Sequence, residues 1–320
     1  MKKTLLISIF PIGLLLILNL LSFDKVAKED QEKDPYKQKL IEGYNIFALP
    51  IPEDLYFAGE KVPVDNFDIK ERFDRELLVN TYWQSQTMLF FKRSHKWFPV
   101  IESILEEEGV PDDFKYLALI ESGLMNVVSP AGATGFWQIL NTTGREMGLE
   151  VNNEVDERYH VEKSTRAACK YFNKAYEKFE NWTLVAASYN MGRSGLSRRL
   201  NEQKVNSYYD LYLNEETSRY VFRILAIKTI LENPETFGFH FREDDLYHPT
   251  DYYTVTADTT IRDMVAFAHK HQVTYKELKT MNPWIRRSNI TNRSGKVYEI
   301  KIIKDSLWDT ASVNAPEEAE

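Results

Sequence analysis

Apolar residues recur at intervals of three and four through most of residues 68–232, and this periodicity constrains the fold more than any other feature. The same stretch has no run of alternating apolar and polar residues, the pattern of half-buried strands. The spacing predicts helices near residues 68–92, 96–108, 114–125, 161–179, 182–190 and 215–232, with a further short one opening at residue 141. The main body of this 320-residue chain is therefore expected to be mainly α, with a sizeable core.

One glutamate, Glu121, interrupts the apolar face of the helix predicted over 114–125. The helix follows a start signal, Pro111 and two aspartates, because acidic groups suit the unsatisfied N–H groups of a first turn. Burial would disfavour the carboxylate form of Glu121, raise its pKa and keep a proton available near neutral pH. Glu121 is therefore a candidate general acid. The alternative is a glutamate that reaches the surface or pairs with an arginine.

A loop of small residues follows this helix, from Ser129 to Gln138, and it ends in an aromatic and an amide side chain. Its glycines let the backbone approach a ligand closely, Trp137 can stack on a sugar, and Gln138 can donate and accept hydrogen bonds. These groups suit a neutral, amide-bearing polymer better than a phosphate. For Trp137 alone, a tight turn capped by a core tryptophan is a reasonable alternative.

Three motifs in a fixed order make the pattern specific: a Glu-Ser pair, a Gly-x-x-Gln loop and a Tyr-Asn pair. Over roughly residues 66–240 the chain resembles the lysozyme-like lytic transglycosylases of the soluble and membrane-bound D type, in glycoside hydrolase family 23. The resemblance implies a lysozyme-like helical catalytic domain. Two positions depart from the usual pattern, since Ser188 stands in place of an alanine and Trp137 in place of a methionine.

The resemblance also implies roles for particular residues. Glu121 matches the single catalytic glutamate, and Ser129 is expected near the substrate's N-acetyl group. Glu216 and Tyr220 match a motif in which Glu and Tyr brace the catalytic helix. The residues expected to bind substrate are Ser122, Ser129, Trp137, Gln138, Tyr189, Asn190, Glu216 and Tyr220.

The reaction implied is cleavage of the β-1,4 bond between N-acetylmuramic acid and N-acetylglucosamine in peptidoglycan, without water. Glu121 would act as acid and then as base, and the product would carry a 1,6-anhydromuramyl end. No cofactor is implied, and no metal, because the histidines form no ligand pair at helical spacing. Two alternatives stay open: a peptidoglycan hydrolase resembling goose-type lysozymes, and a non-catalytic wall-binding protein.

The pattern changes after residue 250. A strand near 253–255, two helices near 259–271 and 275–281, and a strand near 297–303 give a βααβ order that resembles a LysM module. LysM modules bind glycans that contain N-acetylglucosamine. The family's glycine after the first strand is replaced by Ala257, so a purely structural appendage is the alternative. The predicted domains are thus 66–242 and 250–305.

The N-terminus has the form of an export segment. Lys2 and Lys3 precede an apolar run over residues 4–23, long enough to cross a bilayer, so residues 1–23 are a signal peptide or an inner-membrane anchor. The rest would then lie in the periplasm or cell envelope. Residues 24–65 are expected to be a tether and wrapping segment, and 306–320 a disordered tail. The net charge of −8 argues against nucleic acid as a partner, and the oligomeric state stays open.

Overall fold

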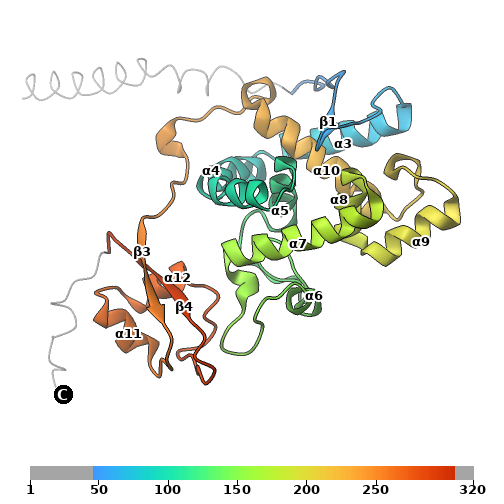
Figure 1. Ribbon diagram of the computed structural model, residues 1–320. Helices are drawn as coiled ribbons and strands as arrows, with labels where there is room; N and C mark the ends of the chain where they lie inside the picture. Colours follow the sequence, from blue (N-terminus) through green and yellow to red (C-terminus); the bar gives the residue numbers. More distant parts are fainter. Residues whose placement is uncertain (1–45, 307–320) are drawn as a thin grey trace, which may run out of the picture. The chain divides into compact units, whose positions relative to one another are not determined.

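A computed structural model of the chain describes residues 46–306 (Figure 1). The predicted signal or anchor at 1–23, most of the tether and the predicted tail after residue 306 lie outside these residues. Among residues 46–306, no helix is both long and apolar enough to cross a membrane. From Leu49 onward the chain forms one compact unit.

The stretch between residues 67 and 232 is helical, which confirms the mainly α prediction. In Figure 1 the short helix α5 (Lys115–Ser122) lies beside α4 (Gln84–Glu107), and it contacts both α4 and α10 (Glu215–Glu232). The helices are α3 (Phe67–Tyr82), α4 (Gln84–Glu107), α5 (Lys115–Ser122), α6 (Asn141–Glu146), α7 (Val161–Phe179), α8 (Trp182–Met191), α9 (Arg193–Gln203) and α10 (Glu215–Glu232).

The boundary between the first two helices differs from the prediction. The periodicity placed a break near residues 93–95, but α4 continues through that region and contains Pro99. The break lies at Trp83, whose backbone (φ −85°, ψ 57°) leaves the helical region without any glycine or proline. Helix α9 was not predicted, because its sequence is polar and only Leu196 is buried.

Helix α5 is shorter and more buried than its predicted counterpart. All residues from Tyr116 to Ile120 are buried, so the helix is enclosed on every side rather than along one stripe. It ends at Gly123, which adopts the left-handed conformation (φ 63°) typical of a helix C-terminus. Leu124 and Met125 therefore do not belong to the helix, and their predicted place on its face is wrong. Glu121 lies in the last turn of α5.

Residues 49–64 pack on the helical core through a small hairpin of β1 (Tyr56–Phe57) and β2 (Glu60–Lys61). Leu55, Phe57 and Val62 are buried in that core. The carboxylate of Glu60 accepts hydrogen bonds from the backbone N–H groups of Trp182 and Thr183, at 2.6 and 2.9 Å. It therefore satisfies two of the free N–H groups at the start of α8.

The C-terminal part consists of β3 (Tyr252–Ala257), α11 (Met264–Lys270), α12 (Tyr275–Met281) and β4 (Tyr298–Ile303). The two strands pair antiparallel over their whole length, from Tyr252 opposite Ile303 to Ala257 opposite Tyr298. The predicted βααβ order is confirmed. Its first helix begins at Met264 rather than near 259, because the Asp263 carboxylate caps it by accepting from Val265 and Ala266 N–H.

A loop of the helical part, residues 150–160, is built into the core of this βααβ module. Val155 and Tyr159 are buried in the module's own hydrophobic cluster. Val155 also forms an isolated β-bridge with Ile285. Glu154 accepts hydrogen bonds from the backbone and side chain of Thr291, at 2.7 and 3.0 Å. The two parts of the chain thus share buried residues.

Candidate active site

The carboxyl group of Glu121 lies among buried groups at the C-terminal end of α5. Its Oε1 accepts a hydrogen bond of 2.5 Å from the hydroxyl of Tyr220 on α10. Burial raises the pKa of Glu121 above its ordinary value, while the Tyr220 hydrogen bond and the nearby charge of Arg223 lower it; the shift is upward. This is the electrostatic setting that a general acid requires near neutral pH.

Helix α10 positions the groups around Glu121. Tyr220 and Arg223 lie one turn apart on this helix, and Arg223 donates to the carbonyl oxygen of Ile120 at 3.2 Å. Tyr220 is buried, and both burial and the nearby Glu121 carboxyl raise its pKa well above 10, so its hydroxyl keeps its proton. Tyr220 therefore braces the glutamate and has no exposed surface with which to bind substrate.

Ser122 is also occupied by protein partners. Its buried hydroxyl donates to the carbonyl oxygen of Phe136 at 2.7 Å and lies 3.3 Å from that of Ala118. It thus ties the end of α5 to the loop at residues 126–139. The predicted contact of Ser122 with substrate stays a prediction, and its buried, bonded hydroxyl does not support it. Its position fits a positioning residue.

Trp137 lies in the core of the helical part. Its side chain is fully buried, its indole N–H donates to Thr165 Oγ1 at 2.9 Å, and its ring packs edge-on against Phe172. The ring has no exposed face for a sugar, which favours the alternative of a core tryptophan over the predicted stacking. The carbonyl oxygen of Trp137 accepts from the hydroxyl of Tyr189 at 2.7 Å, which ties α8 to the loop.

The loop is held in shape by its own backbone and by Gln138. Gln138 has a left-handed backbone (φ 47°), and its amide N–H groups donate to the carbonyl oxygens of Val127 and Gly135, at 3.1 and 2.8 Å. Ser129 is half-buried, and its hydroxyl oxygen accepts from Ala133 N–H at 3.0 Å. Both side chains keep further hydrogen-bonding capacity and partial exposure, so they remain candidates for substrate contact.

Gly135 brings this loop against the loop at residues 150–160. Its φ is +82°, and a side-chain Cβ at this position would lie 2.1 Å from the carbonyl oxygen of Arg158. The Arg158 guanidinium in turn donates to the carbonyl oxygens of Gly132 and Ile139, at 3.0 and 3.1 Å. The glycine is needed here both for its backbone conformation and for the close approach.

Asn190 and Glu216 form a polar group at the start of α10. The Asn190 side chain accepts from the hydroxyl of Thr217 at 2.9 Å and donates to Glu216 at 3.4 Å. Glu216 is exposed and, as a nearby negative charge, it contributes to raising the pKa of Glu121. The structure thus gathers Tyr220, Glu216 and Glu121 at α5 and α10, and links Asn190 to them.

The sequence interpretation missed a group of exposed apolar side chains between Glu121 and Ser129: Met125, Val127 and Val128. Large apolar groups left in water beside a candidate acid are typical of a ligand surface. The signal was present in the sequence, since apolar residues directly after a glycine C-cap cannot continue the helix. Met125 was instead taken as part of the helix face, and Val127 and Val128 were given no role.

Comparison with known families decides what this arrangement is. Residues 99–211 match the model of the transglycosylase SLT domain. Residues 99–211 are a transglycosylase SLT domain. They include Glu121, the loop at 126–139 and the Tyr189–Asn190 pair, whereas Glu216 and Tyr220 follow the matched range. Residues 253–306 match the soluble lytic transglycosylase C-terminal LysM-like domain, which confirms the LysM-like assignment of the module.

Two curated relatives match most of the chain. The chain is 26% identical over 251 residues to the membrane-bound lytic murein transglycosylase D of Escherichia coli strain K12, and equally to that of Escherichia coli O6:H1 strain CFT073. Each alignment covers 76% of this chain and 54% of the relative, so the chain spans about half the length of the curated relatives it matches.

A solved structure is also similar in part: an inactive mutant of the lytic transglycosylase Slt from Pseudomonas aeruginosa. It is 17% identical, with a TM-score of 0.35, and the match covers 47% of this chain and 26% of that one.

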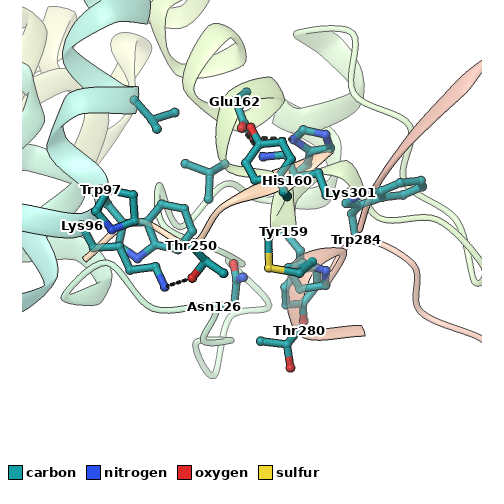
Figure 2. A pocket seen from close by; sticks show the side chains of 16 residues that line it. Lys96, Trp97, Asn126, Tyr159, His160, Glu162, Thr250, Thr280, Trp284 and Lys301 are labelled. Atoms are coloured by element: carbon teal, nitrogen blue, oxygen red, sulfur yellow. Dashed lines mark hydrogen bonds and ion pairs between the residues drawn. The ribbon is translucent and has the colours of Figure 1, made fainter. Parts of the chain in front are cut away.

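A pocket of about 160 Å³ lies where the SLT domain meets the LysM-like domain (Figure 2). Trp97 of α4 and Trp284 of the LysM-like domain contribute aromatic walls. Glu162 forms ion pairs with Lys301 and with His160, and these contacts lower the pKa of Glu162, against the effect of burial, to about 2. None of the predicted site residues, all of which the structure describes, lines this pocket. It is separate from the Glu121 site.

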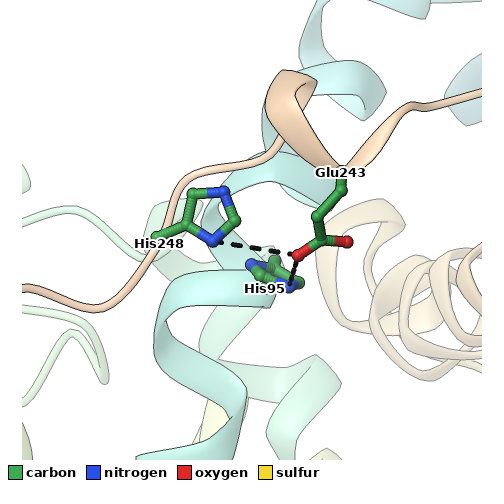
Figure 3. A group of neighbouring side chains, drawn as sticks. All are labelled: His95, Glu243 and His248. Atoms are coloured by element: carbon green, nitrogen blue, oxygen red, sulfur yellow. Dashed lines mark ion pairs between the residues drawn. The ribbon is translucent and has the colours of Figure 1, made fainter.

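Within residues 46–306, one group of side chains could hold a metal ion: His95, Glu243 and His248. It lies outside the predicted site as well, and it joins α4 to the connection that leads from the helices to the LysM-like domain (Figure 3). The expectation of no metal considered only histidines at helical spacing within one segment. This group draws on two segments far apart in the sequence.

Proposed function

We propose that the protein is a peptidoglycan lytic transglycosylase that cleaves the bond between N-acetylmuramic acid and N-acetylglucosamine. The observation that carries this proposal is the carboxyl group of Glu121, which is half-buried, hydrogen-bonded to Tyr220 and shifted to a raised pKa. The SLT domain match and the names of the curated relatives support the same chemistry.

In the first step, protonated Glu121 gives its proton to the bridging oxygen of the β-1,4 bond as that bond breaks at C1 of the muramyl residue. Tyr220 holds the carboxyl in place through its 2.5 Å hydrogen bond. Ser129 and Gln138, which keep exposed polar atoms on the loop, would orient the substrate's N-acetyl group, which stabilises the positive charge that develops at C1.

In the second step, Glu121, now a carboxylate, accepts the proton of the C6 hydroxyl of the same muramyl residue. The C6 oxygen attacks C1 and closes the 1,6-anhydro ring, so no water is consumed. One carboxylate suffices because the substrate supplies the nucleophile, unlike the paired carboxylates of ordinary glycosidases. Arg223 and Tyr220 both favour the carboxylate form that this step needs.

The remaining assignments extend this proposal to the whole chain. We place the catalytic part at residues 66–242 and a glycan-binding part at 250–305, with the LysM-like domain delivering the enzyme to glycan strands. The name of the curated relatives, membrane-bound, supports a location in the cell envelope, with residues 4–23 as signal or anchor.

The test is the mass of the fragments that the purified full chain releases from peptidoglycan. Products that lack one water relative to reducing-end muropeptides are expected, and the Glu121→Gln variant should release none. Glu146→Gln, which alters an exposed glutamate on α6, is the matched control and should behave as the wild type.

Two other results would overturn the proposal in different ways. Hydrated, reducing products would mean that water is the nucleophile and that the protein is a hydrolase of the goose-type lysozyme kind. No release by the correctly folded wild type, from intact or from peptide-free glycan, would mean that the fold serves wall binding alone.

A further inference from the structure

Two imidazoles and a carboxylate converge between α4 and the connection at residues 243–250 (Figure 3). His95 projects from α4, Glu243 opens the short 3-10 turn Glu243–Asp245, and His248 follows a few residues later. His95 Nε2 lies 3.4 Å and His248 Nδ1 3.8 Å from the same oxygen of Glu243. The three ligating atoms all lie within 4.8 Å of one another.

These separations fit ligands around one ion better than hydrogen bonds. A hydrogen bond between nitrogen and oxygen is about 2.7–3.2 Å long, and both contacts exceed that range. Ligands of a tetrahedral zinc ion with bonds near 2.0–2.2 Å are separated from one another by about 3.3–3.5 Å. Small side-chain rotations that move the ligating atoms by about 1 Å would therefore bring all three to coordinating distance from one ion.

The hydrogen bond between His95 and the backbone favours the ring tautomer that metal binding needs. Its Nδ1 lies 3.1 Å from the carbonyl oxygen of Tyr247, so Nδ1 carries the hydrogen and donates it. The lone pair of the neutral ring is then on Nε2, the atom that faces Glu243. A backbone carbonyl that receives the second ring N–H is the usual outer partner of a metal-bound histidine.

The surrounding contacts hold the connection against α4, so the three ligands are positioned before any ion arrives. Tyr247 N–H donates to the carbonyl oxygen of Lys92 at 3.3 Å, and Lys92 Nζ donates to that of Asp245. Lys96 Nζ donates to Thr250 Oγ1 at 3.0 Å. Both nearby lysines thus have partners on the connection and lie along it.

We propose that His95, Glu243 and His248 form a binding site for a divalent transition-metal ion, with Zn²⁺ the best fit to two imidazoles and one carboxylate. A water molecule would complete the four ligands. The ion would fasten the connection at residues 243–250 to α4, and so fix the path by which the chain leaves the helices for the LysM-like domain. The site is independent of the chemistry at Glu121.

Calorimetric titration of Zn²⁺ into the chelator-treated full chain tests this. We expect one saturable site in the wild type, and binding about tenfold weaker or worse in His248→Ala and in Glu243→Gln. His240→Ala, which removes an exposed histidine just before the connection, is the matched control and should bind as the wild type. Hydrogen exchange of residues 243–250 should slow on addition of Zn²⁺ in the wild type and in the control.

The proposal fails if the wild type shows no saturable Zn²⁺ site, or if His248→Ala and Glu243→Gln bind as tightly as the control. Both altered side chains lie on the exposed connection, so the variants are expected to fold. Melting curves in the presence of chelator should coincide with that of the wild type, which separates loss of the site from loss of the fold.

Discussion

Glu121 is subject to two opposing influences, and their balance sets its chemistry. Burial raises its pKa, whereas the Tyr220 hydroxyl and the Arg223 charge lower it. In the proposed mechanism, the first influence would keep the proton on the acid before bond cleavage, and the second would stabilise the carboxylate that remains afterwards. A site that must serve both steps benefits from both.

Replacing Tyr220 by Phe should shift this balance in a predictable direction. Loss of the hydroxyl removes a contact that lowers the pKa of Glu121, so the pKa rises and the acid stays protonated to higher pH. The alkaline limb of the pH–rate profile should therefore move to higher pH. Activity at the optimum should fall about tenfold, as loss of about 1.4 kcal/mol of orientation predicts.

Tyr208→Phe is the control for this variant. Tyr208 is another buried tyrosine that contacts α10, but its hydroxyl donates to the backbone carbonyl oxygens of Thr217 and Ser218. The Tyr208→Phe variant should be less stable than the wild type, but its pH–rate profile should not shift. A Tyr220→Phe profile that stays in place, or moves to lower pH, would contradict the electrostatic role given to Tyr220.

Trp137 should behave as a core residue. In Trp137→Phe the indole N–H that donates to Thr165 is lost, which should cost about 1–2 kcal/mol and lower Tm by several degrees. The KM for peptidoglycan fragments should stay within about twofold of the wild type. Trp83→Phe, at an exposed position, should change neither quantity. A raised KM with an unchanged Tm would restore Trp137 to the binding surface.

At the scale of elements, the sequence predicted the helices whose bounds are set by local spacing and capping. Helices α7, α8 and α10 begin and end within a residue or two of the predicted bounds, because their buried residues recur at helical spacing and side chains cap α8 and α10. Glu121 was found for the same reason, as a charge on an otherwise apolar stretch. The ordered motifs then predicted the loop and the pairs around it.

What the sequence did not predict depends on contacts between distant segments. Ser122 and Trp137 carry polar groups that suit a ligand, and only the positions of Phe136 and Thr165 reveal that those groups are already bonded. The loop at residues 150–160 has a turn-rich composition, and nothing in it indicates that Val155 enters the core of another domain. Such pairings follow from the tertiary fold alone.

Two glycines of the loop at 126–139 allow the effect of backbone strain to be distinguished from the effect of steric contact. Gly132 and Gly135 have nearly the same φ, +78° and +82°, but only Gly135 faces the Arg158 carbonyl. Gly132→Ala should cost about 1 kcal/mol, the strain of a left-handed alanine. Gly135→Ala should cost about 3 kcal/mol or more, since two backbones must separate. Chemical denaturation of both variants measures the difference, and equal losses would mean that the two loops part easily.

At the scale of the whole molecule, the SLT domain and the LysM-like domain are joined through side chains as well as through the chain. Glu150 and Glu157 of the loop at 150–160 both pair with Lys296, at 2.6 and 3.1 Å. Arg286 lies over the ring of Tyr159. The two domains are therefore already docked against each other before either of them would bind glycan.

Glu154→Ala should loosen this docking without unfolding either part. The carboxylate accepts from Asn289 and twice from Thr291, so its loss should speed hydrogen exchange of the Thr291 amide about tenfold. The Tm of the helical part should change little, because Glu154 lies outside its core. Glu146→Ala is the control and should leave both readings as in the wild type. Unchanged exchange at Thr291 in Glu154→Ala would show that other contacts hold the domains together.

The shared core also affects how the two domains can be separated. Val155 and Tyr159 are almost fully covered, and much of their cover comes from the LysM-like domain. A chain that stopped before residue 251 would leave both side chains facing water, an arrangement that promotes aggregation. Activity lost on such truncation would reflect poor solubility as well as lost glycan binding. Replacing Val155 and Tyr159 by polar residues in the truncated chain would restore solubility. Any activity still missing could then be attributed to lost glycan binding.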